Sequence, residues 1–225
     1  MVYADRLTSL TLDASDPRSL AARWRGRRSA EMLCRFPQLE SMEVLDLGGR
    51  PGFWREAPVR PHHVVIVNID EFPAPEPWLS SLVADACSRD RFAGMRFDLV
   101  VSNSTIEHLG GRDRRSRFAE VVHAVSDRWW VQTPYRYFPI EPHWLFPGFQ
   151  FLPESVRVAI TRTWPLGNRR ARTRAEALDL VSEVELLSAT ELRRLFPEGP
   201  VAQGMLIAGL PQPPHTEDGG FGVSR

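Results

Sequence analysis

Residues 44–54 read VLDLGGRPGFW, a hydrophobic run that carries one acid and then breaks into a glycine-rich turn. Glycine lets the backbone approach a ligand closely and adopt positive φ, so Gly48, Gly49 and Gly52 predict a backbone-lined pocket after a strand. The dinucleotide fingerprint G-x-G-x-x-G is absent, because the turn reads G-G-x-x-G. Asp46, near the end of the strand, would repel a pyrophosphate. The stretch therefore predicts a nucleotide-type cofactor that lacks a pyrophosphate.

Composition sets the broad class. With 225 residues and 43% hydrophobic content the chain can bury a core as one domain, and no apolar run approaches the roughly 20 residues of a membrane span. Basic and acidic residues balance at 28 each, which does not indicate a nucleic-acid partner. Cys34 and Cys87 lack metal-site spacing. We expect a cytoplasmic monomer or homodimer without a transmembrane segment.

Hydrophobic periodicity predicts alternating helices and strands, which is typical of an α/β sandwich. The chain is read as one domain over 1–210 with a flexible tail over 211–225. The expected helices cover 17–39, 115–125 and 188–196, and the expected strands cover 42–47, 64–69, 81–86, 97–103, 128–132 and 201–210.

The segment 134–182 interrupts this alternation. Its first half, PYRYFPIEPHWLFPGFQFLP, is too hydrophobic for disorder, so we expect an ordered lid over the carboxyl edge of the sheet. Its aromatic side chains could line a substrate site or form a second small core. The arginines from Arg162 to Arg174 could meet phosphate, but a charge run is more often a solvated helix face, and we favour that interpretation.

Taken in order, VLDLGGRPGFW, VNID, VADA and FDLVVSNSTIEHL resemble the motifs of class I S-adenosylmethionine-dependent methyltransferases, over roughly residues 40–135 and 186–210. The resemblance implies a Rossmann-like sheet of seven mostly parallel strands sandwiched by helices, the last strand antiparallel. Arg50 stands where the family usually keeps a glycine. This departure resembles the D-x-G-G-x-P-x-F-W variant of bacterial sugar and polysaccharide methyltransferases.

The resemblance also implies the ligands of S-adenosylmethionine. Asp46 would attract the cationic cofactor, Asn68 or Asp70 would bind the ribose hydroxyls, and Asp85 would meet the adenine amino group. Each acid alone could instead be a helix cap or a surface group. The full expected set is Asp46, Gly48, Gly49, Arg50, Gly52, Asn68, Asp70, Asp85, Ala86, Ser102 and Asn103.

Two acid–histidine pairs are candidates for catalysis. An alcohol is a poor nucleophile until a base takes its proton, and an acid can hold a histidine in the required tautomer. We prefer His143 as the base, assisted by Glu141 or Glu107, with His108 nearby. Capping of a turn by His108 and aromatic packing by His143 are the structural alternatives. The same four residues could hold a divalent metal such as Mg²⁺.

The segment 134–182 must determine the acceptor. Tyr135, Arg136, Tyr137 and Trp144 are the expected substrate-binding residues, because aromatic rings stack on the apolar face of a sugar. We therefore predict O-methylation of a small polar acceptor, a saccharide or a polysaccharide precursor such as a methylated mannose or glucose chain. The alternatives are a lipid, quinone or polyketide acceptor, or a cofactor-binding protein without catalysis.

Overall fold

The central sheet of the computed structural model begins with the strand that carries Asp46. The structure describes residues 30–167, 169–197, 199, 201–202 and 205–209. Strands β1 (Glu43–Leu47), β2 (His63–Asn68), β3 (Leu79–Val83), β4 (Leu99–Asn103), β5 (Trp129–Pro134), β8 (Val201–Ala202) and β9 (Met205–Gly209) form the sheet in the order β3-β2-β1-β4-β5-β9-β8. The first five strands are parallel, β9 is antiparallel to β5, and β8 is antiparallel to β9.

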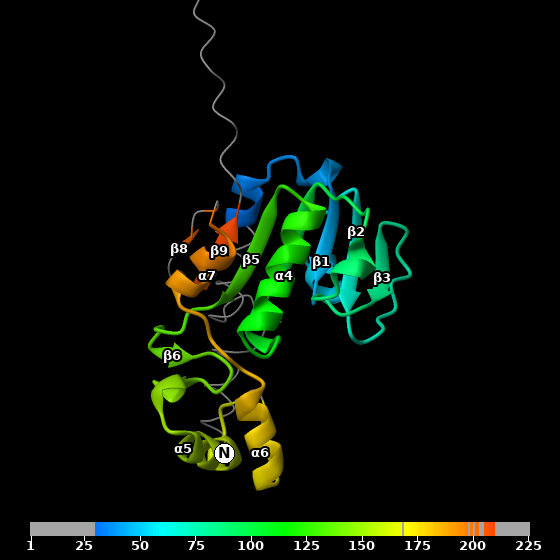
Figure 1. Ribbon diagram of the computed structural model, residues 1–225. Helices are drawn as coiled ribbons and strands as arrows, with labels where there is room; N and C mark the ends of the chain where they lie inside the picture. The colour runs from blue at the N-terminus through cyan, green and yellow to red at the C-terminus, as the bar shows by residue number, and fades with distance from the viewer. Residues whose placement is uncertain (1–29, 168, 198, 200, 203–204, 210–225) are drawn as a thin grey trace, which may run out of the picture.

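Helices cover the sheet and join its strands (Figure 1). The α-helices are α3 (Pro51–Arg55), α4 (Arg112–Val125), α5 (Glu154–Thr163), α6 (Arg174–Ser182) and α7 (Ala189–Leu195). The 3-10 helices are η1 (Leu39–Ser41), η2 (Arg89–Phe92), η3 (Ile106–His108) and η4 (Phe149–Phe151). The predicted α/β class, a mostly parallel sheet flanked by helices, is confirmed.

Alternation along the strands divides the core between the two faces of the sheet. Leu45 and Trp129 pack on the face covered by α4, whereas Val44 and Trp130 pack on the face that carries Trp54. Both tryptophans are buried. A parallel strand buried on both faces needs a continuous hydrophobic run, which explains why β2 reads HVVIVN.

Several predicted boundaries need correction. The strand expected over 81–86 is β3 at Leu79–Val83, so Asp85 and Ala86 follow the strand rather than belong to it. The single strand expected over 201–210 is two strands, β8 and β9, which pair antiparallel. For the helix expected over 17–39, residues 30–35 are helical, and 17–29 lie outside the described residues, as does the tail expected over 211–225.

The segment after β5 has its own hydrophobic core. It holds α5, α6 and a two-stranded sheet of β6 (Ile140–Glu141) and β7 (Phe146–Pro147), and it lies below the main sheet in Figure 1. Trp144 and Phe149 stack at 4.1 Å between ring centroids and pack with Val158 and Leu180. The alternative of a second small core is therefore realised in this segment, which we call the insert.

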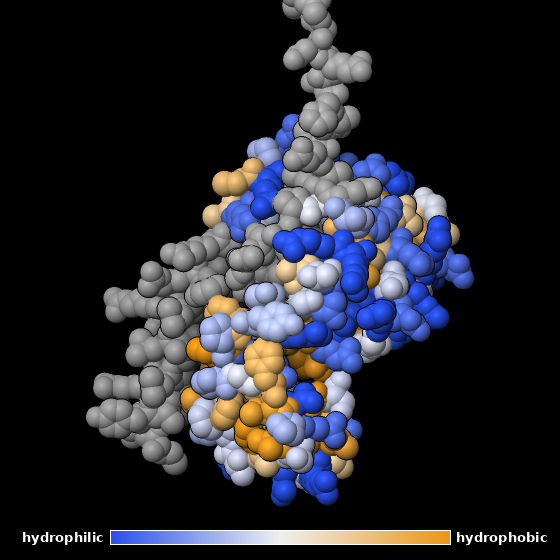
Figure 2. Space-filling view, turned by 60° about the vertical axis from the view of Figure 1, so that its left-hand side comes forward, coloured by the Kyte–Doolittle hydropathy of each residue, from blue (hydrophilic) through white to orange (hydrophobic). Residues whose placement is uncertain are grey.

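Apolar side chains also reach the surface of the insert. Tyr137 and Phe151 are exposed, as are Ile140 and Val156. In Figure 2 apolar colour gathers on the lower part of the molecule, whereas the described surface above it is mostly hydrophilic. None of the helices among the described residues is long and apolar enough to cross a membrane.

Candidate active site

The glycine turn after β1 is shaped by its neighbours. Gly48 has a φ of +80°, and a Cβ there would overlap Thr105. A Cβ on Gly49 would overlap the Asp46 carboxylate, so the position of this carboxylate requires a glycine at residue 49. Asn68, at the end of β2, donates hydrogen bonds to the carbonyls of Gly48 and Gly49 at 3.2 and 2.9 Å. These hydrogen bonds from β2 fix the backbone conformation of the turn.

Asp46 is buried beside this turn. Its Oδ2 accepts a hydrogen bond from Trp54 Nε1 at 2.7 Å, while its Oδ1 has no hydrogen-bond partner among the described residues. Burial raises the pKa of Asp46 to about 7, although the hydrogen bond from Trp54 opposes the shift. Burial of a carboxylate is costly unless it is paired, so the unpartnered oxygen favours a cationic or hydrogen-bonding ligand at this position.

A pocket of about 520 Å³ opens from the turn across the carboxyl ends of β1, β2 and β4. The residues that line it include Asp46, Gly48, Gly49, Arg50, Asn68, Asp85, Ala86 and Asn103. We call it the glycine-turn pocket. Ligands of open α/β sheets characteristically bind at this edge.

Asp85 lies in this pocket as half of an ion pair. Arg114 donates to both Asp85 oxygens at 2.9 and 3.0 Å. Burial would raise the pKa of Asp85, but the Cys87 N–H and Arg114 outweigh it and lower the pKa. Asp85 is therefore held as a carboxylate, an acceptor suited to an amino group.

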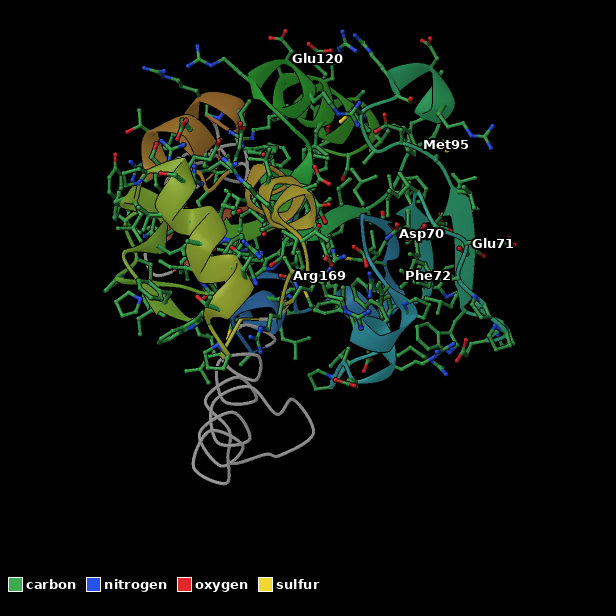
Figure 3. All side chains as sticks on the ribbon, turned by 90° about the horizontal axis from the view of Figure 1, so that it is seen from below. Asp70, Glu71, Phe72, Met95, Glu120 and Arg169 are labelled. Atoms are coloured by element: carbon green, nitrogen blue, oxygen red, sulfur yellow. The ribbon has the colours of Figure 1, made fainter. Side chains whose placement is uncertain are left out.

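Three of the expected cofactor residues do not line the pocket. Ser102 is buried and donates to the Leu47 carbonyl at 2.8 Å, and Gly52 lies within α3 with open space where its Cβ would be. Asp70 is exposed, beside Glu71 and Phe72 in the connection that follows β2 (Figure 3). The residues that sequence reasoning missed include Ser104, Thr105, Leu109 and Arg114. Ser104 has a φ of 56°, which no local sequence pattern indicates.

The acid–histidine residues converge next to the pocket. η3 places Glu107 and His108 shortly after β4, and the end of β6 and the turn that follows it place Glu141 and His143 next to them. The His108 and His143 rings meet edge to face with centroids 5.2 Å apart. Glu107, His108, Glu141 and His143 therefore form one cluster, which we call the histidine cluster.

Within the cluster, Glu141 fixes the orientation of His143. Its Oε1 accepts from His143 Nδ1 at 2.6 Å, and its Oε2 accepts the backbone N–H groups of His143 and Trp144 at 2.7 and 2.9 Å. Burial would lower the pKa of His143, but the hydrogen bond and charge of Glu141 outweigh it and raise the pKa. With Nδ1 donating, the neutral ring presents the lone pair of Nε2.

Glu107 and His108 complete the cluster. Glu107 is fully buried, its Oε2 accepts from Thr133 at 2.9 Å, and its Oε1 has no partner among the described residues. Burial raises the pKa of Glu107 to about 7. His108 Nδ1 lies 3.2 Å from the Glu183 carbonyl, and burial, with the nearby His143, lowers the pKa of His108. His108 also lines the glycine-turn pocket.

A second pocket, of about 630 Å³, lies on the other side of the cluster between α4, α7 and the insert. Arg136, Glu141 and Trp144 line it, together with Phe149, which the sequence reasoning did not single out. Tyr135 and Tyr137 do not belong to its lining; they contact each other with centroids 5.6 Å apart. We call this cavity the insert pocket.

The chain matches no protein-family model and no curated protein, but solved structures share its fold. Magnesium protoporphyrin IX methyltransferase from Synechocystis PCC 6803, with bound S-adenosylhomocysteine, is 13% identical and aligns over 93% of this chain and 94% of its own, with a TM-score of 0.51. A 1,6-didemethyltoxoflavin-N1-methyltransferase from Burkholderia thailandensis is 20% identical over 60% of this chain and 62% of that enzyme, with a TM-score of 0.40. The match thus spans less than two thirds of the Burkholderia enzyme. The likeness to the Synechocystis enzyme shows that this chain has an α/β fold of the kind found in S-adenosylmethionine-dependent methyltransferases.

Proposed function

We propose that the protein is a methyltransferase that binds S-adenosylmethionine in the glycine-turn pocket. One observation carries this proposal: Asp46, a glycine turn and Asp85 line one pocket at the carboxyl edge of a methyltransferase-like sheet, and the buried Asp46 Oδ1 has no hydrogen-bond partner among the described residues. S-adenosylmethionine carries an ammonium and a sulfonium, so the acid would attract it where it would repel a pyrophosphate.

The pocket offers a partner for each part of that cofactor. Asp85 would accept from the adenine amino group, and Ile69, which is 75% exposed and lines the pocket, would contact the adenine ring. The Nδ2 of Asn68 already donates to the glycine turn. The ribose hydroxyls would therefore donate to Asn68 Oδ1, or to Asp70 after movement of the exposed connection. Arg50 lines the pocket and would pair with the cofactor carboxylate.

The acceptor would then be activated in the histidine cluster. His143 Nε2 would take the proton of an acceptor hydroxyl, and bound S-adenosylmethionine would supply the methyl group to the oxygen and leave as neutral S-adenosylhomocysteine. Glu141 holds the tautomer and stabilises the imidazolium that forms. Glu107 and His108 would position the donor and the acceptor at the boundary between the two pockets.

The insert supplies the acceptor side, and we assign it the role of a lid over the carboxyl edge of the sheet. Arg136 and Trp144 line a pocket together with Glu141, and an aromatic ring beside a hydrogen-bond donor suits a saccharide. We therefore assign the methyl group to a saccharide hydroxyl and the enzyme to polysaccharide biosynthesis. Exposed apolar side chains on the insert, such as Tyr137 and Phe151, favour a lipid-linked acceptor as the second candidate.

A divalent metal is the second candidate for hydroxyl activation. Ligand atoms of Glu107, His108 and His143 all lie within 4.8 Å of one another. The Nδ1 atom of each histidine is engaged by an outer acceptor, an arrangement that commonly orients metal ligands through Nε2. A metal such as Mg²⁺ would hold and acidify the hydroxyl. Unchanged turnover after chelation would exclude this candidate, whereas recovery on adding Mg²⁺ would support it.

Calorimetric titration of the protein with S-adenosylhomocysteine and, separately, with NAD⁺ tests the cofactor assignment. We expect S-adenosylhomocysteine to bind with a dissociation constant in the micromolar range, about −8 kcal/mol, and NAD⁺ not to bind. Replacement of Asp85 by Asn should weaken S-adenosylhomocysteine at least roughly tenfold, as expected for loss of a charged hydrogen-bond partner, and Asp90→Asn, an exposed acid outside the pocket, should not. Absence of heat with S-adenosylhomocysteine at millimolar concentration would remove the assignment.

A further inference from the structure

We propose that the insert pocket binds an anionic group of the acceptor, a carboxylate or a phosphate, through a set of arginines. This inference rests on the proposed methyltransferase function and specifies its substrate class. The pocket borders the histidine cluster through Glu141, which lines the cavity and bonds His143. An acceptor that fills the pocket would therefore contact Glu141, the residue that holds the proposed base His143.

The charges that line the insert pocket are unequal. Five arginines, Arg112, Arg115, Arg136, Arg157 and Arg194, face three glutamates, Glu141, Glu185 and Glu191. They come from α4, α5, α7 and the residues after β5, so the fold gathers them from separate parts of the chain. This excess of positive charge is local, because the whole sequence is neutral.

Each glutamate of the pocket already has a partner. Arg115 binds Glu185 at 2.6 Å, Arg136 lies 3.3 Å from Glu191, and His143 binds Glu141. The remaining arginines, Arg112, Arg157 and Arg194, pair with no carboxylate among the described residues; Arg112 and Arg194 are exposed to solvent, and Arg157 is half-buried. An anion that enters the cavity would meet cations that the protein itself leaves uncompensated.

Buried polar atoms at the pocket lack partners as well. The Nε atoms of Arg115 and Arg157 are buried and donate to no acceptor among the described residues, and Arg115 is only 7% exposed. Unsatisfied buried donors are uncommon and costly. In Arg157, Nε and a terminal amino group form a fork that matches the two oxygens of a carboxylate or phosphate, whereas Nη2 of Arg115 is already bonded to Glu185 and leaves only the Nε of its fork to donate. The geometry thus indicates an oxyanion as the missing partner.

Gln150 adds a requirement for a donor. Its Nε2 donates to the carbonyls of Arg136 and Phe138, both at 2.8 Å, and its buried Oε1 accepts from no described residue. A hydroxyl would supply the missing donor, which an oxyanion alone cannot do. Trp144 and Phe149 provide an apolar surface along the same cavity. Together these features fit a hydroxylated, ring-shaped acceptor with an anionic substituent, such as an acidic or phosphorylated sugar.

Calorimetry on the full chain saturated with S-adenosylhomocysteine tests this inference. The probes are glucose 1-phosphate and glucuronate, with glucose as their uncharged counterpart. We expect at least one charged probe to bind tenfold or more tightly than glucose, and the tighter of the two identifies phosphate or carboxylate as the recognised group. Equal binding of all three probes, or no binding of either charged probe, would overturn the inference.

Matched variants assign the binding to the cavity. Arg157→Gln should weaken the preferred charged probe about tenfold, whereas Arg162→Gln, which removes the same charge from the same helix outside the pocket lining, should change it less than twofold. Arg194→Gln on the exposed part of α7 provides a second test if Arg157→Gln does not fold. Equal losses in the pocket and control variants would overturn the inference. Retained binding of S-adenosylhomocysteine separates this failure from failure of the proposed function.

Discussion

The glycine-turn pocket and the insert pocket are similar in volume but differ in construction. The first, about 520 Å³, is built from a backbone turn and strand ends, whereas the second, about 630 Å³, is built from side chains of three helices and an irregular segment. Strand ends of one parallel sheet must meet at one edge, so the first pocket follows from the order of elements. The second depends on contacts between distant residues, and it would be the part of the site that varies with the acceptor.

The histidine cluster joins the two pockets, and its removal should have the largest effect. His143→Ala should lower kcat by about 10²–10⁴-fold, as expected for loss of a general base, while the affinity for S-adenosylhomocysteine changes less than twofold. The measurement is release of S-adenosylhomocysteine from S-adenosylmethionine with an acceptor that binds the insert pocket. His62→Ala, at an exposed position outside both pockets, is the control. Full activity of His143→Ala would remove this residue from the mechanism.

Substitution of two glycines tests how far the glycine-turn pocket depends on its backbone. Gly49→Ala should lower the free energy of unfolding by about 1–3 kcal/mol, because its Cβ would overlap Asp46, and should weaken S-adenosylhomocysteine binding. Gly52→Ala has open space and lies in α3, so it should stabilise the protein by roughly 0.5–1 kcal/mol with unchanged binding. Urea unfolding and calorimetry measure both effects. Weaker binding in Gly52→Ala would restore Gly52 as a cofactor residue.

The pH profile of kcat tests the coupling of Glu141 to His143. His143 must be neutral to accept a proton, so activity should fall as the pH drops through its pKa, which Glu141 raises above the ordinary value of 6.5. Glu141→Gln removes the negative charge that stabilises the imidazolium, so the acidic limb of the profile should move to lower pH. A profile that keeps its position in this variant would show that Glu141 has only a structural role.

The Asp46→Asn variant should gain stability and lose affinity for the cofactor. Burial raises the folded pKa of Asp46 from 3.8 to about 7, so the stability present at low pH is lost progressively between these two pH values. Asp46→Asn avoids this loss and should be more stable than the parent at pH 8.5 by roughly 1–3 kcal/mol, with a smaller gain at pH 5.5. It should also bind S-adenosylhomocysteine more weakly. Urea unfolding at both pH values measures the difference, and a pH-independent difference would contradict the assigned burial cost.

Sequence patterns captured the parts of the molecule that depend on local order. The run with Asp46 and its glycines placed the turn, and the alternating elements indicated the α/β sheet, because strand and helix periods are local properties. The pairing of Arg114 with Asp85 joins residues 29 positions apart, and no local pattern indicates it. The same limit hid Thr105, which packs against Gly48, and Arg157, which reaches the insert pocket.

Other differences arose from short-range geometry. Strand β3 ends at Val83, so VADA contributes its acid from a loop, where the Cys87 N–H and Arg114 can hold Asp85. The spacing of Asp70 predicted a ribose ligand, but Asp70 lies in the connection after β2, outside the lining of the glycine-turn pocket, and is exposed. Some aromatic residues of the insert are buried in its own core and others are exposed on its surface. Composition alone does not distinguish these two positions.

A crystal structure of the protein with S-adenosylhomocysteine would test the division between donor and acceptor pockets most directly. We expect the ligand in the glycine-turn pocket, with its amino group near Asp46, its adenine near Asp85 and its sulfur directed toward the histidine cluster, while the insert pocket remains accessible to an acceptor. Density for the ligand in the insert pocket, or a ligand whose sulfur points away from His108 and His143, would contradict it.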